Sequence, residues 1–384
     1  MKLTDICDVQ GGSQPPKEEW SFEEQEGYIR MLQIRDFTQS ERVTPEYIKI
    51  SNSTKICEAD DILIARYGAS IGKILTGLAG AYNVAIMRTI PDTSKIKKKY
   101  LYYYLKSPYF QNAILNVGSR AAQAGFNKED LSKLDIECPE LSEQENIASI
   151  LDKVEIVIRK RKEELVFLDK LIKARFVEMF GDVKINPHNY KKFSIKSVLK
   201  SCEAGWSGNG TQRIRKDDEI AVLKVSAVTK GYFIPEECKV LDDQENIKKY
   251  VIPEKGDLLF SRANTREMVG ATAIVKEDYP SLILPDKLWK IKFKDNVNVI
   301  YMKYILSSKS VRNQFSAVST GTSGSMYNVS MDKFKGIEIP IPPIELQNQF
   351  ADFVRAVDKS KVAVQRALDE TQLLFDSLMQ KYFG

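Results

Sequence analysis

The stretch KLIKARFVEMFGD at residues 170–182 contains the same Phe-Gly pair as LLFDSLMQKYFG at residues 373–384. A shift of 203 residues lays residues 147–181 over residues 350–384 without a gap, with Phe180-Gly181 on Phe383-Gly384. Repeats of solenoid proteins are only about 20–50 residues long. The period therefore indicates a duplicated domain, not a solenoid.

The match continues upstream of this stretch. IECPELSEQ (136–144) corresponds to IPIPPIELQ (339–347), which places Gln144 on Gln347. With small shifts of register, YLYYYLKS (100–107) corresponds to YMKYILSS (301–308) and DILIAR (61–66) to DLLFSR (257–262), and the pair FN (126–127) lies on YN (327–328). One module is used twice.

The last part of each copy has a narrow apolar stripe with steps of three and four residues. The predicted seam residues are Ile147, Leu151, Val154, Ile158, Leu165, Leu168 and Ile172 in the first copy, and Phe350, Val354, Val357, Val364, Leu368, Phe375 and Leu378 in the second. Such a heptad pattern, flanked by RKRKEE (159–164), favours a long two-helix coiled coil over a surface helix on its own domain. Each helix would run for about 50 Å.

The remainder of each copy alternates short β-rich runs with Gly, Pro, Asn and Ser clusters and two helical patterns. We therefore predict a mixed α+β fold with an internal pseudo-twofold repeat, in which two similar globular domains are joined by two long helices. A twofold between the copies requires these helices to pair antiparallel. The predicted segments are a first domain at 1–143, a first helix at 144–181, a second domain at 182–346 and a second helix at 347–384.

Composition indicates a folded, cytoplasmic protein. The hydrophobic content of 43% supports real cores, and 57 Lys and Arg against 52 Asp and Glu only mildly favour a polyanionic partner. The five cysteines are far apart without a CxxC pair, which is typical of reduced thiols. No apolar run is long enough to span a membrane, so no membrane partner is expected.

Motifs for catalysis are missing from the sequence. The single histidine, His188, lies in the turn-like NPHNY, and YGASIGK (67–73) lacks the spacing of a phosphate loop. Neither a GxGxxG after a strand nor the Asn-Pro-Pro-aromatic motif of an amino-methyltransferase is present. We therefore expect no catalytic, metal or cofactor site in this chain.

Together these features resemble the DNA-specificity (S) subunit of type I restriction-modification systems, over essentially the whole sequence. The most specific words are LSEQ (141–144), LDKLIKARFVEMFGD (168–182) and LTDICDVQGGSQPP (3–16). The second copy departs from the pattern, because Leu346 stands where the first copy has Glu143.

The resemblance implies two target-recognition domains that each read half of a split, asymmetric site in double-stranded DNA. It implies helices that set the spacer and dock two methyltransferase subunits, through which restriction and translocase subunits join. Catalysis and S-adenosylmethionine would then belong to the methyltransferase partner. Two alternatives stay open: a coiled-coil scaffold without a DNA role, and a self-sufficient DNA methyltransferase or nuclease.

Base readout would come from polar side chains on loops that reach a groove. The candidates are Gln14, Arg66, Tyr67, Ser70, Arg120 and Gln123 in the first domain, and Trp206, Asn209, Gln212, Arg213, Arg262, Asn264, Arg266, Thr320, Ser323 and Tyr327 in the second. For each of them the alternative is a turn residue that caps its own backbone. That alternative is favoured for Asn127 and Asn328, because residues that recur in both copies would not read different sequences.

Overall fold

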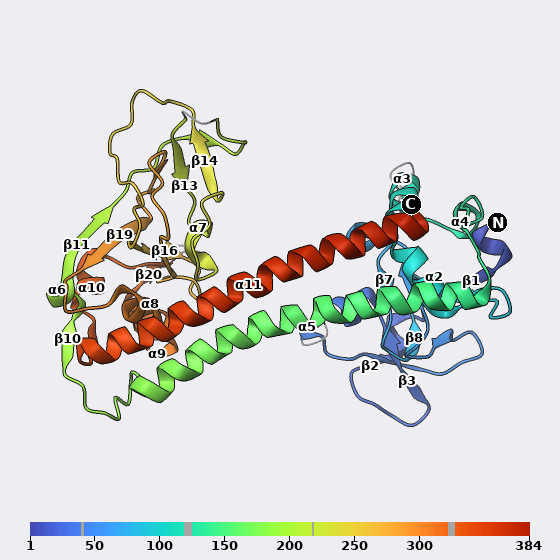
Figure 1. The fold of residues 1–384 in the computed structure, drawn as a ribbon. Coiled ribbons are helices and arrows are strands. Elements are labelled where there is room, and N and C mark those ends of the chain that lie inside the picture. Colours follow the sequence, from blue (N-terminus) through green and yellow to red (C-terminus); the bar gives the residue numbers. More distant parts are fainter. Residues whose placement is uncertain (40–41, 119–124, 217–218, 322–326) are drawn as a thin grey trace. The chain divides into compact units, whose positions relative to one another are not determined.

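The chain divides into two compact units in a computed structural model that describes residues 1–39, 42–118, 125–216, 219–321 and 327–384 (Figure 1). Unit 1 consists of Met1–Glu163 and Gln365–Gly384, and unit 2 of Glu164–Val364. The division therefore cuts both long helices, α5 (Leu141–Phe180) and α11 (Ile344–Phe383). This differs from the predicted segments, which kept each helix whole, because each helix ends in the core of the other repeat.

Among its described residues, unit 1 holds two sheets and four α-helices ahead of α5. The first sheet has the antiparallel order β1 (Cys7–Gly11), β9 (Ile86–Pro91), β6 (Leu63–Ala65), β7 (Ile74–Leu75). The second has the order β2 (Trp20–Ser21), β4 (Tyr47–Lys49), β3 (Tyr28–Leu32), β8 (Gly80–Tyr82), β5 (Ile56–Cys57), in which β3 and β8 are parallel. The short helix α1 (Ile34–Thr38) follows β3, and α2 (Lys98–Lys106), α3 (Pro108–Gly118) and α4 (Lys128–Leu131) lead to α5.

Unit 2 repeats this topology. Its sheets have the orders β11 (Leu199–Ala204), β19 (Leu288–Phe293), β15 (Leu258–Ser261), β17 (Thr272–Ile274), and β12 (Gly210–Thr211), β14 (Cys238–Leu241), β13 (Ala221–Leu223), β18 (Leu282–Ile283). The pair β13–β18 is parallel, as is its counterpart β3–β8. The helices α8 (Val299–Ser307), α9 (Lys309–Val318) and α10 (Met331–Gly336) correspond to α2, α3 and α4.

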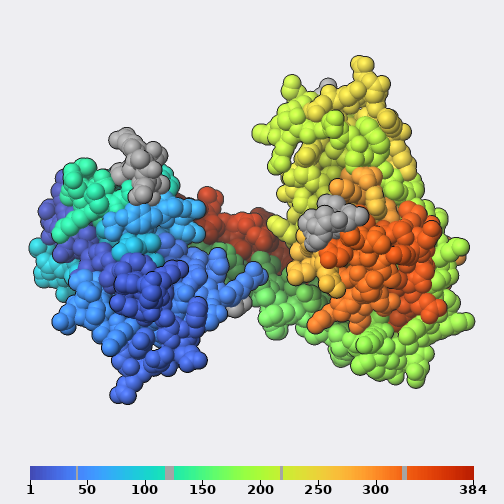
Figure 2. Space-filling model, turned by 180° about the vertical axis from the view of Figure 1, so that it is seen from behind, coloured from blue at the N-terminus to red at the C-terminus, as the bar shows by residue number. Residues whose placement is uncertain are grey.

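In two places the structure describes strands in unit 2 where unit 1 has an isolated bridge. The pair β10 (Lys192–Ser194) and β22 (Glu338–Pro340) stands in the place of the bridge Lys2–Asp135, and a small sheet of β16 (Ala263–Asn264), β21 (Tyr327–Asn328) and β20 (Thr320–Gly321) in the place of the bridge Tyr67–Gly125. The short helices α6 (Ile195–Val198) and α7 (Ser226–Thr229) correspond to the 3-10 helix at Leu3–Asp5 and to α1. In Figure 2 the helical part of unit 2 (orange) and its second sheet (yellow-green to yellow) occupy separate parts of the surface. The predicted mixed fold with an internal repeat is confirmed. Among the described residues, no helix is long and apolar enough to cross a membrane.

The two Phe-Gly ends pack crosswise. Phe383, at the end of the second repeat, lies 5.0 Å from the ring of Tyr100 in unit 1. Phe180, at the end of the first repeat, lies 4.9 Å from the ring of Tyr301 in unit 2. Both tyrosine hydroxyls donate to a backbone carbonyl just ahead of a long helix, at Glu137 (2.9 Å) and Pro340 (2.7 Å). Each core thus contains an aromatic residue that the other repeat supplies.

The long helices run antiparallel in each unit. Phe176 packs on Phe350 at 5.4 Å in unit 2, while Ile147 and Leu151 share a cluster with Met379 in unit 1. All predicted seam residues are buried or half-buried. The buried stripe continues beyond them, through Phe176, Phe180, Met379 and Phe383. Lys361, which interrupts the apolar stripe between Val357 and Val364, pairs with the carboxylate of Asp169 at 2.6 Å.

The helices begin at Leu141 and Ile344, three residues before the predicted starts at 144 and 347. The recurring glutamine therefore lies inside the first turn, with its side chain fully buried. The Oε1 of Gln144 accepts from the backbone N–H of Lys97 (2.8 Å), and the Oε1 of Gln347 accepts from that of Asn298 (2.9 Å). Each amide thus ties the start of a long helix to the start of α2 or α8, which explains its recurrence structurally.

Both units also bury an aspartate ahead of the central strand of the first sheet. Asp61 pairs with Arg88 (2.8 Å) and Lys98 (3.1 Å), and Asp257 pairs with Lys290 (3.1 Å). Each carboxylate also accepts a backbone N–H three residues earlier in the chain. A buried carboxylate is tolerated only with such partners, so these ion pairs belong to the framework that the units share.

The crosswise packing predicts that Phe180→Ala destabilises unit 2 although Phe180 belongs to the first repeat. Removing a buried Phe side chain costs about 3–5 kcal/mol, and Phe383→Ala should affect unit 1 in the same way. Hydrogen exchange followed by mass spectrometry resolves the two units. Phe167→Ala is the matched control, because Phe167 is 63% exposed on the same helix. Loss of protection confined to residues 1–140 in Phe180→Ala would contradict the arrangement.

The Asp61 ion pairs predict a pH-dependent contribution to stability. Burial alone would raise the pKa of Asp61, but the backbone N–H that it accepts, Lys98 and Arg88 together lower it below its ordinary value. The stabilisation is therefore present above the unfolded pKa of about 3.9 and is lost as the pH falls through the depressed folded pKa.

We expect Asp61→Asn to lower the free energy of unfolding by about 1–3 kcal/mol at pH 7, and this difference from the wild type to vanish in acid. Urea denaturation at several pH values measures it. Asp60→Asn is the control, because Asp60 shares Lys98 but is 80% exposed. A deficit that stays constant from pH 7 to strongly acidic pH would show that the charge is not responsible.

Candidate nucleic-acid interface

In unit 1 the predicted loops meet at one edge of the first sheet. The backbone N–H of Ser13, just after β1, donates to the carbonyl of Tyr82 (3.1 Å). That of Arg66, just after β6, donates to Ala85 in the β8–β9 loop (2.8 Å). Because three strand ends converge here, Gln14 and Tyr67 come from distant sequence positions to the same edge. Both side chains are exposed.

Arg66 connects these loops through its side chain as well. Its guanidinium donates to the carbonyls of Phe126 (3.3 Å) and Val84 (3.5 Å) and lies 5.0 Å from the centre of the Tyr67 ring. Tyr67 bridges to Gly125, where a Cβ would come within 2.4 Å of the ring. Glycine is therefore required at 125, and the arginine is partly a structural residue.

The same loops converge in unit 2. The backbone N–H of Trp206 donates to Leu284 (2.9 Å) and that of Arg262 to Lys287 (3.0 Å), which are the counterparts of the bonds at Ser13 and Arg66. Ala263 pairs with Asn328 as Tyr67 bridges to Gly125. The candidate surface is thus a repeated feature of the fold.

The side chain of Arg262 is already engaged within unit 2. Its Nε donates to the carbonyl of Asp286 (2.9 Å), and its terminal nitrogen pairs with the Asp286 carboxylate (3.0 Å). The other carboxylate oxygen accepts the hydroxyl of Ser207 (2.5 Å). The predicted contact from Arg262 to a base would have to compete with this ion pair.

The small sheet β16-β21-β20 gathers further candidates. Asn264 pairs with Tyr327, and the neighbouring position of β21 pairs with Thr320. The guanidinium of Arg266 lies 6.0 Å from the centre of the Tyr327 ring. Thr320 and Arg266 are exposed, while Asn264 and Tyr327 are half-buried. Polar and aromatic side chains from two separate loops are thus brought onto one surface.

Other candidates lie apart from this surface or have structural partners. Trp206 packs on Val222, Leu241 and Ile283. Arg213 forms a bidentate pair with Glu219 (2.7 and 2.6 Å), and this contact lowers the pKa of Glu219 to about 2.

Gln212 accepts from Lys224 (3.4 Å), Asn209 is exposed, and Ser70 is half-buried in a 3-10 turn, Gly68–Ser70. Arg120, Gln123 and Ser323 lie outside the described residues.

Asn127 is a helix cap, which is the backbone-capping role that the sequence favoured for it. Its side chain accepts from the backbone N–H of Asp130 (3.0 Å) at the start of α4. The residue that caps α10 is Ser330, which accepts from Lys333, not Asn328. The sequence alignment of Asn127 with Asn328 is therefore two residues out of register, because a short motif of two residues cannot fix a register across loops.

Sequence reasoning missed Asp286 and Ser207, which bond to each other across 79 residues of sequence. The available signal was the turn word LPDK (284–287) between two β-rich runs.

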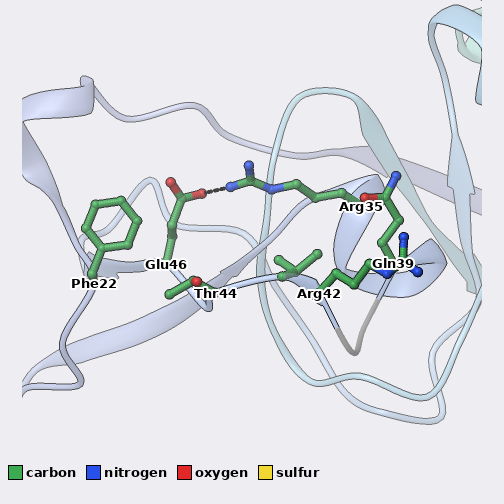
Figure 3. Close-up of a pocket in the computed structure, with 7 residues that line it drawn as sticks. Phe22, Arg35, Gln39, Arg42, Thr44 and Glu46 are labelled. Carbon is green, nitrogen blue, oxygen red and sulfur yellow. Dashed lines mark hydrogen bonds and ion pairs between the residues drawn. The ribbon is translucent and has the colours of Figure 1, made fainter. Parts of the chain in front are cut away.

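A separate hollow in unit 1 is lined by Phe22, Arg35, Gln39, Arg42, Val43, Thr44 and Glu46 (Figure 3). None of the predicted site residues lines this hollow, and its central charges, Arg35 and Glu46, pair with each other. Among the described residues, no group of three or more His, Cys, Asp or Glu side chains could hold a metal ion.

Comparison with known proteins agrees with the repeat. The family model for the type I restriction modification DNA specificity domain matches residues 1–166 and 187–371. The chain is 24% identical over 309 residues to the EcoKI specificity subunit of Escherichia coli K12, covering 74% of this chain and 64% of that protein. It is 22% identical over 351 residues to the MjaVIII specificity subunit of Methanocaldococcus jannaschii, covering 88% and 80%.

The chain thus spans less than two thirds of the first of these relatives. A solved chain from work on complex assembly and conformational transition of the type I R-M system superposes with a TM-score of 0.58 at 16% identity, covering 100% of this chain and 96% of that one. At this identity the likeness speaks to the fold.

Proposed function

Because the chain belongs to the type I restriction modification DNA specificity family, we propose that it is the DNA-reading subunit of a type I restriction-modification complex. Each unit would bind one half of a bipartite, asymmetric site in double-stranded DNA. The observation that supports this most is the repeated loop surface: the same strand ends converge in both units, joined by the same backbone bonds at Arg66 and Arg262.

The side chains on this common framework differ between the units. Where unit 1 presents an exposed Gln14 and Tyr67, unit 2 has an exposed Ser207 and a buried Ala263 at the corresponding places. A shared framework with different polar side chains is what two modules that read different base sequences require, because sequence is read by side chains at base edges, and the framework only positions them.

The long helices have surfaces that suit protein partners. Val166, Phe167 and Val177 are between 54% and 63% exposed on α5 in unit 2, and Leu373 and Leu374 are 71% and 50% exposed on α11 in unit 1. Exposed apolar residues in such number are typical of interaction sites. We propose that two methyltransferase subunits dock here, that restriction subunits join through them, and that these partners supply S-adenosylmethionine and catalysis, so that this chain is non-catalytic.

Selection from a pool of random duplexes tests the proposal. The chain, produced with its methyltransferase partner, should enrich two short half-sites separated by unread base pairs, with an affinity that falls steeply as salt rises. A scaffold without a DNA role would enrich nothing. Methylation by the isolated chain would instead support the self-sufficient enzyme.

If the length of the helix pair sets the distance between the half-sites, then longer helices should select a longer unread spacer. Seven residues inserted after Leu165 and seven after Leu368 keep the apolar seam in phase, and lengthen the pair by about 10 Å, or roughly three base pairs of duplex. The selected site should keep both half-sites and gain spacer, with some affinity lost to deforming the DNA. Four-residue insertions, which break the phase of the seam, are the control. An unchanged spacer with intact binding would mean that the helices do not set the distance.

A further inference from the structure

In unit 2 three of the loops that form the candidate surface meet at one carboxylate, Asp286. Its two oxygens accept from Ser207 (2.5 Å), in the loop after β11, and from Arg262 (3.0 Å), in the loop after β15. Asp286 itself lies in the loop between β18 and β19, and its backbone N–H donates back to the Ser207 hydroxyl (3.2 Å). Three strand ends that are distant in sequence are therefore joined by one side chain.

Arg262 extends this connection to a fourth segment. Its backbone carbonyl accepts from Val329 (2.9 Å), directly after β21, and its backbone N–H donates to Lys287 (3.0 Å). Strand β16 begins directly after Arg262, and β21 ends directly before Val329. Asn264 of β16 and Tyr327 of β21 are paired in register. These two candidate side chains thus lie on strands connected to Arg262, whose side chain pairs with Asp286.

Unit 1 lacks the carboxylate. At the place of Asp286, unit 1 has Val84. The Val84 carbonyl accepts from the Arg66 guanidinium at 3.5 Å, whereas the Asp286 carbonyl accepts from Arg262 at 2.9 Å. Arg66 turns to the carbonyl of Phe126 and to the ring of Tyr67 instead. The clamp of Arg262, Asp286 and Ser207 is therefore specific to unit 2 and is not required by the shared fold.

We propose that Asp286 is a positioning residue for half-site recognition by unit 2, holding Arg262 and Ser207 so that the loops bearing Asn264, Tyr327 and Ser207 meet DNA in one arrangement. The inference rests on the proposed function. A carboxylate at a surface that binds phosphates is repelled by them, and pairing with Arg262 removes that repulsion. Hydrogen bonds from Ser207 and Arg262 also outweigh burial and lower the pKa of Asp286, so the charge is held at neutral pH.

The proposal predicts the DNA affinity of the double variant at Asp286 and Arg262. If Arg262 acts through Asp286, then Asp286→Asn and Arg262→Ala disable the same device, and the double variant should lose no more affinity than the worse single variant. We expect each to lose about tenfold on the cognate site and to relax the base preference of one half-site only. The slope of affinity against salt should stay that of the wild type, since no phosphate contact is removed.

The experiment uses the complex of the full chain with its methyltransferase partner, in site selection and in binding titrations over a salt series. Asp242→Asn is the matched control, because the Asp242 carboxylate also accepts a hydroxyl in unit 2, from Thr211 (2.9 Å), whereas the bonds of the clamp run from Ser207 and Arg262 to Asp286. Its half-site preferences should match the wild type. Ser207→Ala, which removes one bond without touching the ion pair, should relax the same half-site more weakly and keeps the test decisive if Asp286→Asn folds poorly.

Several outcomes would overturn the inference. Additive losses in the double variant would make Arg262 and Asp286 separate DNA contacts, and a salt slope that falls by about one in Arg262→Ala would make Arg262 a phosphate contact. Equal relaxation of both half-sites, or unchanged selection by Asp286→Asn and Ser207→Ala, would also sink it. In each of these cases the wild-type complex still selects a bipartite site. If the wild type selects none, the proposed function itself has failed.

Discussion

Each globular unit is completed by an aromatic side chain that the other repeat supplies. Phe383 closes on Tyr100 in unit 1, and Phe180 closes on Tyr301 in unit 2. Fully burying an aromatic side chain contributes a few kcal/mol, which is a large share of the stability of a small domain. Each helix must therefore leave its own domain and reach the other core. The antiparallel pairing of α5 and α11 is the consequence.

The two repeats share buried polar residues and differ at exposed loop positions. The buried Gln144 and Gln347 have the same role at the two helix starts, and Asp61 and Asp257 have the same role beside the first sheet. These groups recur because a buried polar side chain needs its partners in place. The exposed loop positions carry no such constraint. They are free to differ, which is what a protein with two different reading surfaces would need.

Prediction of individual loop residues was limited for physical reasons. Trp206 lies in a glycine-rich loop segment, yet its side chain packs in a small core. The type of a residue does not by itself determine whether its side chain is exposed. Arg262 has the donors for a guanine contact, but the same donors suit Asp286, and only the fold brings that carboxylate near. The alignment of Asn127 with Asn328 shows that loop insertions move the register where no periodic pattern holds it.

The sequence by itself determined the duplication, the mixed α+β class, the long helices and their apolar seams, because periodicity and repetition are properties of the chain alone. The resemblance to the family was also carried by segments of the sequence. Only the tertiary structure decided that each helix ends in the core of the other repeat, that the helix-opening glutamines tie two helices together, and that Asp286 meets Arg262 and Ser207. These are contacts between residues from 24 to 283 positions apart. Such contacts depend on how strands and helices are placed in space, which no local pattern records.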